Sequence, residues 1–182
     1  AAYPLKDIAC ERIINANSDK IMSKDEVSTW RKAKFFYDWV SRTSQIPVIG
    51  QIIFNIFNEL QKIAPLYPIR KNTASNFSVN YLDSQIKNGL GKGLISYVKK
   101  KKIPFVTTFY IPAIAANYYK LHNTYCVITD TDVNRIWVPK DSSKSIIKYF
   151  APSEHVVERL ISYGVKQEDI FYTGFPLPKE CI

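Results

Sequence analysis

Three short polar clusters contain the residue types best suited to bind and act on a polar ligand. They are Thr107-Thr108-Phe109, Thr129-Asp130-Thr131-Asp132 and Thr173-Gly174-Phe175-Pro176. Each follows a short apolar run that has the composition of a buried strand. Because ligands of open parallel sheets bind beyond the carboxyl ends of the strands, the clusters are expected to line one cleft. A carboxylate such as Asp130 could orient or polarise a hydroxyl group there, and Gly174 could let the backbone approach closely.

A simpler structural explanation stands beside the functional one for several of these residues. A single aspartate after a strand, such as Asp130, can also cap a helix or lie in a loop. Trp137 belongs to a residue type that packs in cores more often than it supports a sugar ring. Neither His122 nor His155 stands in a motif, so both are expected to be surface or capping histidines. The three clusters at successive strand ends nevertheless favour a cleft.

The elements that must position these clusters alternate between strand and helix in the second half of the chain. A weak helix interrupted by Gly89, Gly91 and Gly93 is predicted before the Lys99–Lys102 cluster, whose cations suit a helix C-terminus. Strands are predicted at 103–108, 125–129, 146–150 and 170–172, and a helix at 112–119. A second helix is predicted after Ser153, which is expected to be its N-cap, and is expected to end at Gly164. This alternation predicts an α/β fold, a Rossmann-like parallel sheet covered by helices on both faces.

The first part of the chain is predicted to be helix-rich. Leu5, Ile8, Ala9 and Ile13 form one apolar face after Pro4, and Ser23 and Glu26 have the spacing of a capping box. Large apolar residues repeat at helical spacing over 49–63, and residues 67–80 are polar and irregular, as in a loop. We therefore divide the chain into a helical part, 1–80, and a βα part, 81–182, which together make one domain.

The composition narrows the class of partner. The chain has 182 residues with 25 Lys and Arg against 16 Asp and Glu, a formal charge of +9 that favours a membrane leaflet, a nucleic acid or a phosphorylated substrate. Cys10, Cys126 and Cys181 are too widely spaced for a disulfide framework or a zinc site, so we expect no metal and a reducing cytoplasmic location. The most apolar stretch, 46–66, holds too many polar residues to cross a bilayer, so we expect neither a membrane span nor a signal peptide.

A basic and aromatic segment in the first part could lie at a membrane surface, where cations attract headgroups and aromatics settle at the boundary. The residues expected to face the membrane are Trp30, Arg31, Lys34, Phe35 and Trp39. The apolar stripe over 49–63 could join them, but ordinary packing against the sheet is the alternative for that stripe.

From about Gly91 onward, the chain resembles a known enzyme family. The motifs that carry the resemblance are Pro104-Phe105-Val106-Thr107-Thr108-Phe109, Ile128-Thr129-Asp130 with Ile136-Trp137-Val138, and Ala151-Pro152-Ser153-Glu154 with 170–176. They look like the N-terminal domain of the diacylglycerol glycosyltransferases, which comprise processive glucosyltransferases and monogalactosyldiacylglycerol synthases. These are in turn similar to the peptidoglycan-precursor N-acetylglucosaminyltransferase, and all have the GT-B fold. Each motif is short, but their order extends over roughly half the chain.

The resemblance implies two Rossmann-like domains, of which this chain would be the acceptor-binding one. The UDP-sugar donor would lie mainly on a C-terminal domain missing from the chain, and no other cofactor is implied. Thr129 and Asp130 match the family's Thr-Asp pair and Trp137 its following tryptophan. Thr173, Gly174 and Pro176 match its Thr-Gly-x-Pro turn beside the cleft. Thr108 and Phe109 complete the set expected to bind the acceptor.

The departures from the family pattern concern the catalytic base. The glycine-rich loop that ends in a histidine would lie before Ala1, and the histidine that follows the Thr-Asp pair in many members is Asn134 here. We therefore expect a fragment of an inverting glycosyltransferase that is inactive alone, with Asp130 orienting a lipid or membrane-associated hydroxyl acceptor on the inner face of the cell membrane. A non-catalytic binding or scaffold module is the first alternative. A basic nucleic-acid-binding domain is the second, although no nucleic-acid-binding motif is present and no nucleic acid is expected.

Overall fold

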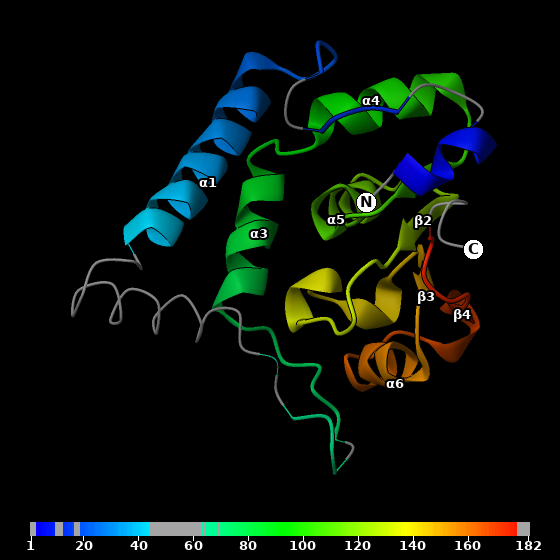
Figure 1. Ribbon diagram of the computed structural model, residues 1–182. Helices are drawn as coiled ribbons and strands as arrows, with labels where there is room; N and C mark the ends of the chain where they lie inside the picture. Colours follow the sequence, from blue (N-terminus) through cyan, green and yellow to red (C-terminus); the bar gives the residue numbers. More distant parts are fainter. Residues whose placement is uncertain are drawn as a thin grey trace.

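The computed structural model describes residues 3–9, 13–16, 19–43, 63, 65–68 and 70–177. Its helices are η1 (Tyr3–Ile8), α1 (Lys24–Thr43), α3 (Phe77–Lys87), α4 (Lys92–Lys101), α5 (Tyr110–Tyr118), η2 (Arg135–Trp137), η3 (Ser142–Lys144), α6 (Glu154–Ser162) and η4 (Gln167–Asp169). Its strands are β1 (Phe105–Thr107), β2 (Thr124–Val127), β3 (Ile147–Ala151) and β4 (Ile170–Tyr172). Figure 1 shows the sheet on one side of the molecule and α1 on the other, with α3 between them.

The four strands form one parallel sheet in the order β1-β2-β3-β4. Helix α5 connects β1 to β2 and packs on the first three strands, and α6 connects β3 to β4 and packs on both. The α/β, Rossmann-like arrangement predicted from the sequence is therefore confirmed. The carboxyl ends of β1, β2 and β4, which precede the three polar clusters, therefore point to the same edge of the sheet.

The two faces of the sheet differ in exposure. Right-handed crossovers between strands in sequential order place their helices on the same face. On that face Tyr149 and Cys126 are fully buried, whereas Val106 and Phe171 on the other face are 51% and 41% exposed. Tyr125 stacks on Phe150 on this second face, with 5.7 Å between the ring centroids. Helices were predicted to cover both faces, and within the described residues the crossover helices cover only one, because each crossover returns on the same side.

The capping box predicted at the start of the second helix is confirmed and has an additional role. The Ser23 amide donates to Glu26 Oε2 at 2.9 Å, and the Glu26 amide donates to Ser23 Oγ at 3.2 Å. The same Glu26 carboxylate accepts the Gly93 amide, at 3.0 Å to Oε1 and 3.2 Å to Oε2. Glu26 is 4% exposed. It therefore joins α1 to the first turn of α4, where the helix dipole favours a negative charge.

Two glycines allow this close packing around α4. Gly91 has a φ of +81°, and a Cβ there would lie 2.5 Å from the Cβ of Ala115 in α5. A Cβ on Gly93 would collide with the Glu26 carboxylate. Glycine is therefore required at position 91, and a side chain at position 93 would displace the Glu26 carboxylate. The glycines that weaken the helix pattern in the sequence are the contact points of α4 with α1 and α5.

Four predicted segments differ from the structure or lie outside it. The first helix is a short 3-10 turn, and residues 13–16 are not helical. The single weak helix is two helices, α3 and α4, because the chain turns at Asn88–Gly91. The loop over 67–80 ends earlier, since Asn76 caps α3 by accepting the Val79 amide at 2.9 Å. The helix predicted over 49–63 lies outside the described residues except for Ile63.

Among the helices that the structure describes, none combines the length and apolarity needed to cross a membrane.

Candidate functional site

The register of the sheet places the three polar clusters along one edge. Thr107 pairs with Cys126, Val127 with Phe150, and Ala151 with Tyr172. The segments that follow these residues therefore leave the sheet side by side, in the order of the strands. Adjacent strands lie about 4.8 Å apart, so the tips of β1 and β4 are separated by about 14 Å. A ligand that touches both the Asp130 segment and the Thr173 segment must span two strand intervals, or about 10 Å.

Asp130 is the unpaired carboxylate of this edge. It is exposed and, within the described part of the chain, makes no hydrogen bond or ion pair. Partial burial raises its pKa. Its charge also acts on Tyr110, because burial and, secondarily, the negative charge of Asp130 raise the pKa of the Tyr110 hydroxyl. Asp130 is thus a carboxylate of increased basicity beside an aromatic residue, which is suited to accept a hydrogen bond or a proton from a hydroxyl.

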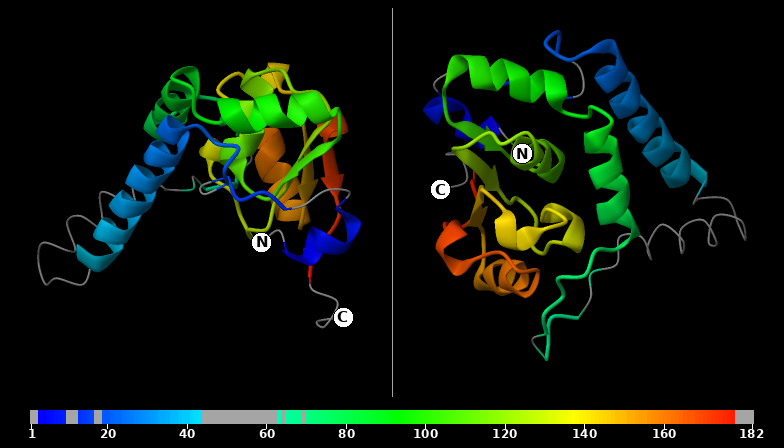
Figure 2. Two further views of the ribbon diagram at one scale, coloured as in Figure 1. Left: turned by 90° about the horizontal axis from the view of Figure 1, so that it is seen from above. Right: turned by 180° about the vertical axis from the view of Figure 1, so that it is seen from behind.

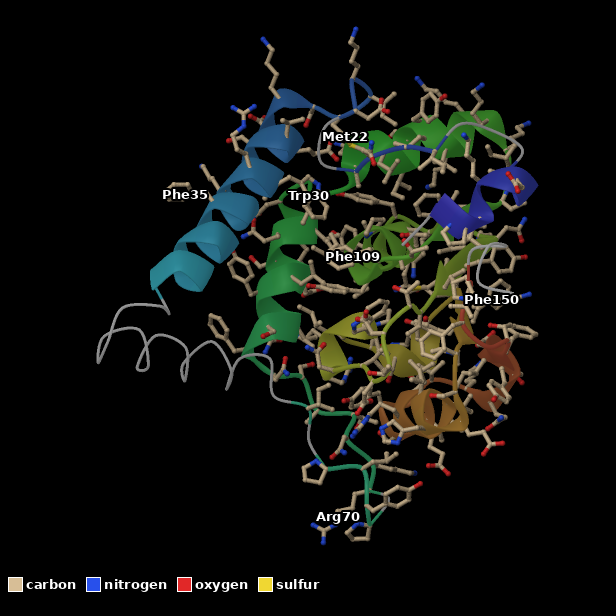
Figure 3. The ribbon with its side chains drawn as sticks, viewed as in Figure 1. Met22, Trp30, Phe35, Arg70, Phe109 and Phe150 are labelled. Atoms are coloured by element: carbon tan, nitrogen blue, oxygen red, sulfur yellow. The ribbon has the colours of Figure 1, made fainter. Side chains whose placement is uncertain are left out.

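Three aromatic rings lie together at the β1 end of the edge. Phe109 is 4.4 Å from Tyr110 and 6.3 Å from Trp137 between ring centroids, and Tyr110 is 5.4 Å from Trp137. Phe109 is 42% exposed, whereas Trp137 is 4% exposed. Figure 3 shows Phe109 near the centre of the view, and it directly precedes α5. The buried Trp137 ring therefore packs against the other two rings, and Phe109 offers the accessible apolar surface.

The threonines and the glycine shape the backbone of the edge. Thr107 Oγ1 accepts the Phe109 amide at 3.1 Å and donates to the Phe109 carbonyl at 3.0 Å, which turns the chain directly after β1. Thr108 and Thr129 are half-buried. The Thr173 amide donates to the Ala151 carbonyl at 3.0 Å, which extends the pairing of β4 with β3 past the end of the strand.

Gly174 adopts a φ of +77°, but no atom lies within 4 Å of the position that a Cβ would take. Glycine is therefore favoured there by backbone conformation, and the close approach expected from the sequence is not made within the described residues. Pro176, two residues further on, is half-buried.

A second carboxylate at this edge, Asp132, is fully engaged. Its Oδ1 accepts from Arg159 Nε at 3.0 Å, and its Oδ2 accepts from Arg159 Nη2 at 2.8 Å. His155 Nε2 lies 3.0 Å from the same Oδ2. Burial alone would raise the pKa of Asp132, but the hydrogen bonds from Arg159 and His155 outweigh it and lower the pKa. Asp130 and Asp132 are two residues apart in sequence and opposite in environment.

The contacts of His155 and Arg159 with Asp132 were not predicted from the sequence. His155 is exposed, as predicted for a surface histidine, and it lies in the first turn of α6 against Asp132. The imidazole is partly exposed, and Asp132 holds one of its two ring nitrogens. The i, i+4 spacing of His155 and Arg159 on an amphipathic helix could have indicated that both face one partner. Asn134 differs from them, since its buried Oδ1 has no hydrogen-bond partner within the described residues.

The Asp132 ion pair leads to a pH-dependent prediction. Because the folded pKa of Asp132 is lowered, its stabilising effect is complete above the unfolded pKa of about 3.9 and disappears as the pH falls below it. Asp132→Asn should lower the free energy of unfolding by about 1–2 kcal/mol at pH 7. The difference from the unmodified chain should shrink toward pH 3, as urea denaturation at a series of pH values would measure. An equal difference at pH 3 and pH 7 would show that the ion pair does not stabilise the fold.

The residues predicted to face a membrane divide into two groups. Figure 3 shows Phe35 on the side of α1 that points away from the other elements, and it is 71% exposed. Arg31 is also exposed, whereas Trp30 is half-buried and packs against the core. The side chains of Lys34 and Trp39 lie outside the described part of the structure. Trp30 thus helps to hold α1 on the domain, and a membrane role for Phe35 and Arg31 stays a prediction.

The described residues contain no group of three or more His, Cys, Asp or Glu side chains that could hold a metal ion. Cys126, in β2, is fully buried, and burial raises the pKa of its thiol far above the ordinary value. This thiol is therefore kept protonated and unreactive.

Comparisons with known proteins point to one enzyme class. Three curated proteins from Bacillus cereus, strains B4264, G9842 and ATCC 14579, are named processive diacylglycerol beta-glucosyltransferase and match this chain. Each is 36% identical over 53 residues, which make up 29% of this chain and 13% of the relative. No family model matches the chain, and no solved structure matches it significantly. The chain therefore contains a glycosyltransferase-like segment. Of the enzymes named from the sequence, the similarity supports the processive glucosyltransferases. It does not extend to the monogalactosyldiacylglycerol synthases or to the peptidoglycan-precursor N-acetylglucosaminyltransferase.

Proposed function

We propose that this chain is the acceptor-binding part of an inverting glycosyltransferase that transfers a sugar from a UDP-sugar to a lipid or membrane-associated hydroxyl group. The observation that supports it most is Asp130, an unpaired carboxylate of raised pKa at the end of β2, beside Tyr110. The short similarity to diacylglycerol glucosyltransferases agrees with this chemistry.

In this proposal the acceptor lies along the edge of the sheet. Its hydroxyl donates a hydrogen bond to Asp130, which increases the electron density on the attacking oxygen and fixes its direction. The apolar part of the acceptor contacts Phe109, whose ring is held in place by Tyr110 and Trp137. The sugar donor approaches from the side of the Thr173–Gly174 turn and is bound mainly by a second domain outside these 182 residues.

The positive charge of the chain suits the same proposal. A formal charge of +9 would draw the protein to an anionic leaflet, where the acceptor is dissolved. Arg31 and Phe35, on the exposed side of α1, would contact that surface. We accordingly place the protein on the inner face of the cell membrane as a peripheral protein.

Acceptor binding by this chain tests the proposal directly. The chain should bind diacylglycerol presented in neutral detergent micelles, and Phe109→Ala should weaken binding about tenfold, because an exposed aromatic contact is lost. Phe171→Ala is the matched control, since Phe171 is 41% exposed against 42% for Phe109 but lies within β4 on the open face of the sheet. Tryptophan fluorescence titration would measure the affinities. Equal losses in the two variants, or no binding by the unmodified chain, would contradict the proposed acceptor site.

A further inference from the structure

A cavity of about 460 Å³ lies away from the candidate site, between α3, α5 and the segment that leads into β3. Its volume is in the range of small-molecule binding sites. None of the residues assigned to the acceptor edge lines it. Figure 2 shows α3 and α5 from two further directions, with α3 next to α1 and α5 next to the sheet.

The cavity lies toward the opposite end of the sheet from the acceptor edge. Lys120 follows the end of α5 and precedes β2, and Asp141 and Lys144 precede β3. These residues therefore stand before the amino ends of their strands. Asp130 and Thr173 follow the carboxyl ends. A ligand in the cavity would not occupy the acceptor position.

The floor of the cavity is apolar and well packed. Leu82 and Ile86 from α3, Ile114 from α5 and Val138 from the β2–β3 connection are all less than a tenth exposed. Burial of an alkyl chain among such side chains is favourable by about 0.8 kcal/mol per methylene, or about a fourfold gain in affinity for each added carbon.

The rim of the cavity carries an excess of positive charge. Four lysines line it, Lys87, Lys120, Lys140 and Lys144, against two aspartates, Asp83 and Asp141. Lys87 Nζ lies 2.7 Å from Asp83 Oδ2, and Lys144 Nζ lies 2.7 Å from Asp141 Oδ2. Both carboxylates are thus neutralised by their own lysines, and the charges of Lys120 and Lys140 remain uncompensated.

The charge of Lys120 contributes to the lowered pKa of Asp141 on this rim. Hydrogen bonds from Lys144 and Ser143, together with the positive charges of Lys144 and Lys120, lower the pKa of Asp141. Lys120 is therefore within electrostatic range of the Lys144–Asp141 pair. Its backbone has a φ of +57°, a conformation that lysine adopts at some cost in energy.

The wall of the cavity is held by a buried cation. The Arg135 guanidinium donates from Nη1 to the Val138 carbonyl at 2.7 Å and to the Pro139 carbonyl at 3.1 Å, and from Nη2 to the Lys140 carbonyl at 3.1 Å. Val138, Pro139 and Lys140 all line the cavity. The side of the cavity that carries Lys140 is thus a fixed structure rather than a loose loop, which reduces the entropy lost when a ligand binds.

We propose that this cavity binds one molecule of a single-chain anionic amphiphile, with its alkyl chain on the apolar floor and its carboxylate or phosphate near Lys120 and Lys140. The combination of a buried apolar floor in a half-open cavity with two uncompensated ammonium groups at the rim matches both halves of such a molecule. The site is separate from the proposed acceptor edge and does not depend on the proposed function.

Isothermal titration calorimetry of this chain tests the site with monomeric probes below their micelle concentrations. Decanoate should bind with a stoichiometry of one, octanoate about fifteenfold more weakly because two methylenes are lost, and decyltrimethylammonium much more weakly than decanoate. Equal affinity for the anionic and cationic probes would overturn the proposal. So would binding to anionic phospholipid vesicles without any binding of monomeric decanoate, because the surface would then be a membrane contact.

Two lysine variants separate binding from folding. Lys120→Gly removes the ammonium group while relieving the left-handed backbone, so the chain should fold at least as well and bind decanoate at least fivefold more weakly. Lys102→Gly is the matched control, because Lys102 has a φ of +55° and does not line the cavity. Equal affinities of the two variants would overturn the assignment.

Ile136→Trp, which adds bulk at the cavity wall, should also reduce decanoate binding. Unchanged affinity in that variant would contradict the location of the alkyl chain.

Discussion

Under the proposed function, Asp130→Asn is expected to reduce sugar transfer by the complete protein about 100- to 10,000-fold while its folding stays intact, because asparagine accepts a hydrogen bond weakly and cannot accept a proton. Burial raises the pKa of Asp130 in the folded chain. Its carboxylate therefore disfavours the folded state as the pH rises through that pKa, so the variant should be as stable as the unmodified protein at pH 7 or slightly more so. Loss of activity without loss of stability is typical of a functional residue.

The neighbouring aspartate supplies the matched control for this experiment. Asp132→Asn removes a carboxylate two positions away, but this carboxylate is bound to Arg159 and His155 and should contribute to stability. Turnover with UDP-glucose and diacylglycerol, measured beside urea denaturation, should therefore separate the two variants. Near-normal turnover of Asp130→Asn in a folded protein would remove Asp130 from the reaction, whereas no turnover by the unmodified complete protein would leave a binding module as the better description. That result would not affect the cavity between α3 and α5.

Arg135→Met is expected to lower the free energy of unfolding by about 3 kcal/mol or more, the largest stability effect that the structure predicts. The guanidinium is 5% exposed and, among the described residues, pairs with no carboxylate. It donates to the carbonyls of Val138, Pro139 and Lys140, and its Nη2 also donates to the Thr73 carbonyl at 3.1 Å. Methionine has a similar length but no donor, so these carbonyls would lose their partner inside the protein.

Two further variants identify the cause of this loss. Arg135→Lys keeps the charge and three donors, so it should restore part of the stability. Arg70→Met is the surface control, because Arg70 is exposed and Figure 3 shows it at the outer end of the loop that precedes α3. It should change stability by less than about 0.5 kcal/mol. Equal effects of Arg70→Met and Arg135→Met in thermal or urea denaturation would rule out a special role for the buried guanidinium.

Much of the fold was predictable because its signals are local. Ser153 caps α6 by accepting the Val156 amide, and Gly164 ends it with a φ of +89°, both as the sequence indicated. The last strand, 170–172, has the predicted bounds. The split between α3 and α4 was missed because Gly91 allows a close contact with Ala115, and no local pattern reports a partner that lies 24 residues away.

The sequence by itself determined the order of strands and helices, the parallel sheet and the edge at which Thr108, Asp130 and Gly174 emerge, because these follow from apolar periodicity and capping over a few residues. Only the tertiary structure decided which aspartate is unpaired, since the partner of Asp132 is Arg159, 27 residues further along the chain. It also decided that Arg135 is buried against Thr73, 62 residues earlier, and that three separate segments line one cavity. Such contacts depend on packing, which brings together residues whose separation along the chain carries no signal.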